Sequence, residues 1–280
     1  MPLFQHHNAT RYVVPLREGG SLPAIVETAT DDLFVVKFRG AGQGARALIA
    51  ELLAGGIAQH LGFRVPELAL VDLADTFGRT ERDPEIQDLL QASRGVNVGL
   101  RFMEGALNFD PLASAPLVDP EWAAEVVWLD AFVTNIDRTP RNPNMMIWDE
   151  QIWLIDHGAT LYFHHNWDGL GEAQIHTPFA PIHQHVLLPH MGDLNAADVR
   201  LTERLSAEVF ARLLAAIPDA LFMDAPEGRT PPFPTADANR AAYADVLARR
   251  LHGPRTFVAE AIRAQQAFRD TPSDRLNYRR

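Results

Sequence analysis

The chain has 280 residues, of which 47% are hydrophobic, so it is long enough to bury a core and to form two lobes. Its formal net charge of −11 argues against direct nucleic-acid binding, because proteins that bind phosphate backbones are usually basic. Cysteine, long apolar runs and a signal-peptide pattern are absent from the sequence, which predicts no disulfide, no thiolate metal site, no membrane span and a cytoplasmic location.

The first part of the chain is predicted to be rich in strands. Apolar stretches at residues 11–16 and 23–29 flank the turn-forming REGGS and predict a hairpin. The helical spacing of apolar residues in GARALIAELLAGGIAQHLGF predicts a helix. Further strands are predicted at residues 33–38, 67–74 and 95–103, and the charged segment between the last two has room for one short helix.

The pattern changes after Gly105. The segment DPEWAAEVVWLDAFVTN predicts a helix with Asp119 as its cap and a proline in its first turn. The stretches NMMIWD and IWLID predict a hairpin of two short strands, and the residues from 164 to 193 show little periodicity. Three closing helices are predicted within residues 195–218, 235–253 and 253–268. The chain therefore divides into a mostly β lobe and a mostly α lobe.

Lys37 is the only lysine, so 24 of the 25 Lys and Arg residues are arginine. It lies in the apolar strand DLFVVKFRG, where a charge needs a partner. An ammonium is a compact charge and a guanidinium is a planar fork, so this position is predicted to require the ammonium itself. The alternative is a buried stem whose head reaches water.

Glu51 is the predicted partner of Lys37. It is the only charged residue between Arg46 and His60, and small neighbours such as Ala47 and Gly55 would let another element approach its face of the helix. A strand lysine paired with a helix glutamate holds the ATP phosphates in kinases. The alternative is a solvated helix charge.

Two backbone segments are candidate contacts for the rest of the nucleotide. The turn residues Gly19, Gly20 and Ser21 present N–H groups that could cradle phosphate, although Gly-Gly-Ser is also an ordinary turn. Phe102, Met103 and Glu104, in RFMEG, could meet adenine through their backbone, or could simply end a strand.

Three polar residues flank the short hairpin. Asp137 follows a predicted helix, Asn142 comes five residues later, and Asp156 closes the second strand before His157 and Gly158. Phosphoryl transfer needs a carboxylate that orients the attacking hydroxyl and accepts its proton, and it needs hard oxygen ligands for Mg²⁺. This spacing of Asp, Asn and Asp-x-Gly supplies both. The adjacent Arg138 could contact phosphate or pair with an acid.

Five segments carry a resemblance to a known family: REGGS, FVVKFRG, ELLAGGIAQHLGFRVPE, NIDRTPRNPNMMIW and WLIDHGATLYFHH. In these segments the sequence resembles the HipA-like kinases of bacteria, especially their short stand-alone branch. The family is related to protein and lipid kinases. The resemblance implies an α+β, two-lobed kinase-like fold, with an ATP-binding N-lobe at residues 1–104 and a C-lobe at residues 105–280. It implies use of ATP and Mg²⁺, with Lys37 as phosphate ligand, Asp137 as catalytic base, and Asn142 and Asp156 as metal ligands.

The resemblance also implies transfer of phosphate to serine or threonine on a protein substrate. Toxin members of the family are restrained by a DNA-binding antitoxin, but this chain is too short for their extra amino-terminal module, which leaves an antitoxin partner open. The alternatives are a small-molecule or lipid kinase, an ATP-binding pseudokinase, and a metallohydrolase. The last is suggested by seven of the 11 histidines, which lie between His157 and His190 but match no zinc motif.

Overall fold

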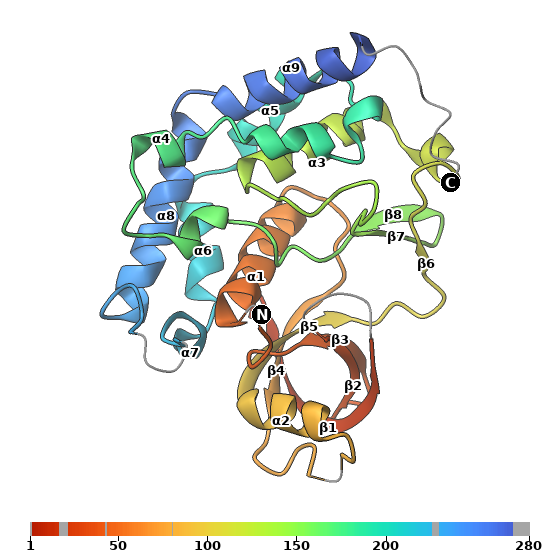
Figure 1. Cartoon of the computed structure of the whole chain (residues 1–280), viewed down its shortest axis with the longest axis vertical. Helices are drawn as coiled ribbons and strands as arrows, with labels where there is room; N and C mark the ends of the chain where they lie inside the picture. Colours follow the sequence, from red (N-terminus) through yellow and green to blue (C-terminus); the bar gives the residue numbers. More distant parts are fainter. Residues whose placement is uncertain (1, 17–21, 43, 80, 226–229, 271–280) are drawn as a thin grey trace. The chain divides into compact units, whose positions relative to one another are not determined.

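The computed structural model describes residues 2–16, 22–42, 44–79, 81–225 and 230–270 (Figure 1). The chain forms two compact units. Unit 1 consists of Met1–Asn108, Met145–Thr160 and Ala207–Leu247, and unit 2 of Phe109–Asn144, Leu161–Ser206 and Ala248–Arg280. The chain first leaves unit 1 close to the predicted lobe boundary at Glu104, but it returns twice, so the units are not the continuous ranges 1–104 and 105–280. None of the described helices combines the length and the apolar character that crossing a bilayer requires.

Unit 1 is built around a closed β-barrel (Figure 1). Its strands follow the order β1 (Gln5–Pro15), β2 (Ala24–Thr28), β3 (Leu33–Lys37), β5 (Gly95–Arg101) and β4 (Leu68–Leu73). The predicted hairpin is confirmed as β1 and β2, which pair antiparallel. The sequence pattern missed the first residues of β1, and these pair in parallel with β4 and close the barrel.

Alternation along the strands fills the barrel and places Lys37. In β2 and β3 the buried residues recur at every second position, as in Phe34 and Val36, because successive side chains point to opposite faces. Helix α2 (Pro84–Ala92) adds Leu90 to this core. Lys37 follows Val36 and therefore points away from the barrel interior, toward α1.

Helix α1 (Gly44–His60) has apolar residues on nearly all of its sides, and these residues are buried. This is typical of a helix that other elements surround. It packs against β4 and β5 of the barrel, and also against α6 (Ala207–Ala215) and α7 (Asp219–Phe222). A Cβ atom at Gly56 would meet a Leu213 methyl carbon of α6 at 2.8 Å. The Leu213 side chain therefore packs directly on the α1 backbone at this position.

The predicted short hairpin is confirmed as β7 (Met145–Trp148) and β8 (Gln151–Leu154). Its two turn residues, Asp149 and Glu150, both have positive φ angles, 50° and 58°, as a two-residue hairpin turn of type I′ requires. Strand β6 (Leu107–Asn108), which was not predicted, pairs with β7. The hairpin positions the polar segment that follows β8.

Unit 2 is organised around α3 (Pro120–Phe132), which begins at the predicted cap: Trp122 N–H donates to the Asp119 carboxylate at 2.9 Å. Helices α5 (Leu194–Arg204) and α9 (Thr256–Asp270) pack against it. The segment of low periodicity forms short helices: η2 (Tyr162–His165), α4 (Glu172–Ile175), η3 (Ala180–Gln184) and η4 (Leu188–His190). The remaining helices are η1 (Ala115–Leu117) and α8 (Ala236–His252), which contributes residues to both units.

The prediction of one helix within residues 195–218 is wrong. The segment forms two helices, α5 and α6, separated by Leu205 and Ser206. Leu205 has an extended backbone, with φ −105° and ψ 144°, and its side chain is buried. The apolar periodicity continues across the break, so the sequence pattern alone does not reveal it. At this break the chain passes from unit 2 to unit 1.

Candidate active site

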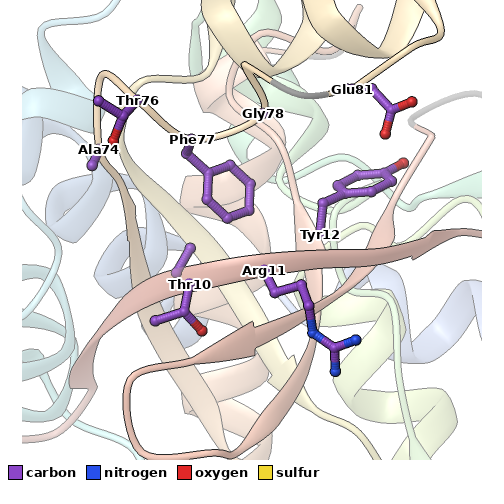
Figure 2. A pocket seen from close by; sticks show the side chains of 9 residues that line it. Thr10, Arg11, Tyr12, Ala74, Thr76, Phe77, Gly78 and Glu81 are labelled. Carbon is purple, nitrogen blue, oxygen red and sulfur yellow. The ribbon is translucent and has the colours of Figure 1, made fainter.

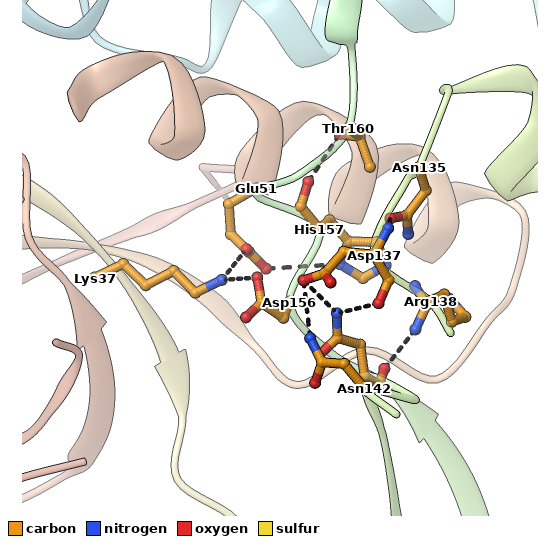
Figure 3. Close-up of polar contacts among 10 residues, drawn as sticks. Lys37, Glu51, Asn135, Asp137, Arg138, Asn142, Asp156, His157 and Thr160 are labelled. Atoms are coloured by element: carbon orange, nitrogen blue, oxygen red, sulfur yellow. Dashed lines mark hydrogen bonds and ion pairs between the residues drawn. The ribbon is translucent and has the colours of Figure 1, made fainter. Parts of the chain in front are cut away.

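Lys37 lies between two carboxylates of unit 1 (Figure 3). Its Nζ atom is 2.5 Å from Glu51 Oε2, on α1, and 2.5 Å from Asp156 Oδ1, just after β8. Lys37 is buried and Glu51 is completely so, which confirms a buried pair and contradicts both the water-reaching lysine and the solvated glutamate. The strand, helix and hairpin predicted separately thus bring three charged groups together.

The charges within this group stabilise one another. Burial by itself lowers the pKa of Lys37, but Glu51 and Asp156 outweigh burial and raise that pKa above its ordinary value. Burial raises the pKa of Glu51, yet the Lys37 charge and His157 hold that pKa well below its usual range. An ammonium and an ionised carboxylate are therefore both present near neutral pH.

Small residues on α1 allow the segment after β8 to reach Glu51, as the sequence predicted. Ala47, Glu51 and Gly55 are four residues apart and share one face of the helix. A Cβ atom at Gly55 would lie 3.5 Å from His157 Nδ1 and 2.9 Å from Leu68 Cδ1. A Cβ atom at Gly158 would lie 3.5 Å from the Ala47 carbonyl oxygen. The residues that follow Asp156 therefore pack against this face of α1.

Asp156 has a strained backbone and a half-exposed carboxylate. Its φ angle is +54°, a left-handed conformation that non-glycine residues adopt infrequently. The left-handed residue of this segment is therefore Asp156 and not the nearby Gly158. Such strain is concentrated at functional sites. The side chain is 42% exposed, and of its two oxygens Lys37 holds Oδ1. A second carboxylate oxygen suits a hard cation such as Mg²⁺.

Unit 2 carries the second group, in the loop after α3. The Asp137 Oδ2 atom accepts hydrogen bonds from the Asn142 Nδ2 atom at 2.9 Å and from the Asn144 Nδ2 atom at 3.3 Å (Figure 3 draws the first). The Asp137 backbone N–H donates to Asn135 Oδ1 at 3.0 Å. Since Asn142 donates through its nitrogen, its amide oxygen is directed elsewhere and can serve as a ligand.

A fully buried carboxylate, that of Asp130, binds residues of this loop. Asp130, on α3, accepts hydrogen bonds from Arg138 Nε at 2.5 Å and Asn135 Nδ2 at 2.8 Å, and it pairs with His185 Nε2 at 2.8 Å. Burial raises the pKa of Asp130, but the Arg138 charge and the His185 hydrogen bond outweigh burial and keep that pKa well below its usual range. Arg138 also donates to the Asn144 carbonyl oxygen. Arg138 is therefore paired with a neighbouring acid, one of the two alternatives that the sequence left open.

The sequence pattern missed Asp130, Asn144, His157 and His185. One of them had a usable signal: Asp130 is the only charged residue between Glu125 and Asp137, in an otherwise apolar stretch. The same argument had identified Glu51. The other three lie next to predicted ligands or in an aperiodic segment, and only the folded chain shows their contacts.

The proposed backbone contacts for the nucleotide are described only in part. Gly19, Gly20 and Ser21 lie outside the described residues. Strand β5 ends at Arg101, and Phe102 N–H still donates to the Leu33 carbonyl oxygen at 2.9 Å. The carbonyl oxygens of Met103 and Glu104 accept from Ala106 N–H and Trp148 Nε1. These residues form an ordered turn, and their contact with adenine stays a prediction.

Two surface pockets of unit 1 are lined by other residues. One, of about 280 Å³, lies where β1 separates from β4 and has Thr10, Tyr12 and Phe77 in its wall (Figure 2). The other, of about 340 Å³, lies between Gly40–Gly42 and α2. Because neither lining contains Lys37, Glu51 or Asp156, we assign neither pocket to phosphoryl transfer.

Among the histidines after β8, His164 and His165 lie together, with their Nε2 atoms 3.2 Å apart. Within the described ranges of the chain, no group of three or more His, Asp or Glu side chains is arranged to hold a metal ion. Three others each face one acidic residue: His157 faces Glu51, His185 binds Asp130, and His176 Nε2 lies 3.2 Å from a Glu172 carboxylate oxygen. The described histidines therefore give no support to the metallohydrolase alternative.

A buried lysine–glutamate pair beside a β-barrel, and an Asp–Asn loop at the end of a helix, are parts of a kinase-like phosphotransferase. The crystal structure of "A Helicobacter pylori proinflammatory kinase CtkA" is similar to this chain with a TM-score of 0.53 and 14% sequence identity. The similarity covers 93% of this chain and 98% of that one, and it shows a kinase-like fold. The chain belongs to the HipA-like kinase family, whose model matches residues 11–241. No match was found among curated proteins.

Proposed function

We propose that this protein transfers the γ-phosphoryl group of ATP, with Mg²⁺, to a serine or threonine hydroxyl of a protein. The observation that carries this proposal is the position of Lys37, which is buried and lies 2.5 Å from carboxylate oxygens of both Glu51 and Asp156. An ammonium held in this way is a fixed point charge suited to phosphate. The division into an ATP-binding lobe and a catalytic lobe is part of the proposal.

Each residue is assigned a role in this reaction. Lys37 binds phosphate oxygens and Glu51 holds its ammonium in place. Asp137 orients the acceptor hydroxyl and accepts its proton, while Asn142 and Asn144 fix the carboxylate that does so. Asp156 and Asn142 would hold Mg²⁺, which would neutralise charge on the phosphates. The chemistry is mainly positioning and electrostatic stabilisation.

The test of this function is incubation of the protein with γ-labelled ATP, Mg²⁺ and a lysate of the host, followed by identification of the labelled proteins. Parallel incubation of Asp137→Asn separates true acceptors from background. Labelled serine or threonine in a protein supports the proposal. Label found only in lipid or in a small metabolite would assign the same site to a different acceptor, and no label in any fraction would contradict phosphoryl transfer.

We expect ATP with Mg²⁺ to raise the melting temperature, because a ligand that binds only the folded state stabilises it. At about 100 times Kd the stabilisation is about 2.7 kcal/mol. Asp156→Ala should remove the Mg²⁺-dependent part, measured by thermal unfolding with and without EDTA. Asp75→Ala is the control, since the Asp75 side chain is 82% exposed. Equal Mg²⁺-dependent shifts in wild type and Asp156→Ala would remove Asp156 from the metal site.

Lys37→Arg should fold but transfer phosphate poorly. The larger planar guanidinium should misplace the charge that Glu51 and Asp156 hold, and a misplacement of about 1 Å costs on the order of 100-fold in rate. Glu51→Gln should be impaired in the same way. The double variant should lose less than the product of the two separate losses, because both changes disrupt one pair. Independent losses, or a fully active Lys37→Arg, would show that the pair does not hold the phosphates.

A further inference from the structure

His157 has a completely buried ring whose nitrogens lack hydrogen-bond partners within the described part of the chain. Its Nδ1 atom lies 3.6 Å from Glu51 Oε1, and that oxygen also lacks a partner there. Buried polar groups are nearly always hydrogen-bonded, and a buried charged oxygen without a donor is costly. Two unsatisfied buried groups that face each other, just beyond hydrogen-bond distance, form a natural donor–acceptor pair.

We propose that His157 is a positioning residue for Glu51. With a proton on Nδ1, the imidazole donates to Oε1, so that Oε2 stays turned toward Lys37. This inference rests on the proposed function, because it assigns His157 to the Lys37–Glu51 pair of that reaction. Two features of the packing favour it. Helix α1 packs closely on the ring, since a Cβ atom at position 55 would lie in van der Waals contact with Nδ1, at 3.5 Å. Glu51 is also too deeply buried for water to satisfy it readily.

The position of Lys37 explains why the orientation of Glu51 matters. Its ammonium is shared between Glu51 and Asp156, each at 2.5 Å. If the Glu51 carboxylate turns, Lys37 is left with Asp156 alone, and the carboxylate proposed to hold Mg²⁺ becomes its only counter-charge. Protein kinases have phenylalanine between the corresponding Asp and Gly, whereas this chain has a ring with an N–H donor.

Two variants separate the donor from the ring. His157→Phe keeps a flat ring and loses both nitrogens, while His157→Asn loses the ring but places an amide N–H one bond beyond Cγ, as Nδ1 is. We expect His157→Phe to lower kcat/KM for ATP by about 10- to 100-fold, and His157→Asn to recover most of this loss. In a Glu51→Gln background, His157→Phe should cause little further loss, because its effect passes through Glu51. Thermal unfolding checks that each variant folds, and His157→Met replaces His157→Phe if the latter does not.

The single lysine provides a readout that is independent of turnover. Protein made with ¹³C,¹⁵N-lysine and a lysine-free tag gives one lysine side-chain signal, that of Lys37. His157→Phe should shift this signal, and His157→Asn should leave it close to the wild-type position. An unchanged signal in His157→Phe, equal defects in the Phe and Asn variants, or a full additional loss in the Glu51→Gln background would each overturn the proposal. If wild type transfers no phosphate, the proposed function fails, and the lysine signal still decides whether His157 positions Glu51.

Discussion

Asp137→Asn should lower the rate of phosphoryl transfer by about 10²- to 10⁴-fold, the usual contribution of a general base, and leave folding and ATP affinity nearly unchanged. Asparagine has almost the same shape, and its amide oxygen can still accept from Asn142 and Asn144. What it lacks is the negative charge that attracts the proton of the acceptor hydroxyl. The measurement is initial rate at saturating ATP, together with ATP affinity by calorimetry.

Asp110→Asn is the matched control for this change. The Asp110 carboxylate also accepts two hydrogen bonds, from the backbone N–H groups of Leu112 and Ala113, and it belongs to the same unit. Its conversion to asparagine removes a comparable charge outside the proposed machinery and should change the rate less than a few-fold. An Asp137→Asn enzyme as active as this control would mean that another group accepts the proton.

The Lys37–Glu51 pair could be predicted because both residues break a strong local pattern. One is the only lysine of the chain, in an apolar strand, and the other is an isolated charge in an apolar helix. Burying either charge alone is so unfavourable that each implies a partner. The same reasoning applies to Asp130, whose partner Arg138 lies only eight residues later. Isolated charges in apolar segments therefore carried most of the information about this site.

Other features depend on contacts that no local pattern encodes. The barrel closes through parallel pairing of β1 with β4, and these strands are far apart in sequence. The positive φ angle of Asp156 is a second such feature, because nothing in the sequence next to it requires a left-handed backbone. The contact of His157 with Glu51 is seen only in the folded chain, where the ring is buried beside that carboxylate. Sequence reasoning named the candidate ligands Lys37, Asn142 and Asp156, and it missed His157 and Asp130, whose contacts only the folded chain shows.

Asp130→Asn should destabilise the protein by about 3–5 kcal/mol, the usual cost of removing one partner from a buried ion pair. The Arg138 guanidinium would remain fully buried without its counter-charge, and its Nη2 atom already lacks a partner in the described part of the chain. Such a loss is a large share of a typical stability of about 5–15 kcal/mol. Urea unfolding at pH 7 measures it. Glu121→Gln, on the same helix, is the control: its side chain is 76% exposed and 3.7 Å from Arg200, so the cost should be below about 1 kcal/mol.

The pH dependence of this loss gives a second, independent check. Because the pKa of Asp130 is lowered in the folded state, its stabilising contribution is complete above its unfolded pKa of about 3.9 and is lost as the pH falls toward the folded pKa. Burial lowers the pKa of His185 in the wild type, so its protonation costs stability below about pH 6.5. Asp130 opposes this lowering, so in Asp130→Asn the cost is at least as large. The stability difference between wild type and Asp130→Asn should therefore be large at pH 7 and narrow below about pH 4. A difference that stays constant down to pH 3 would mean that Asp130 acts through its shape and hydrogen bonds, and that its charge contributes nothing to the support of the Asp137 loop.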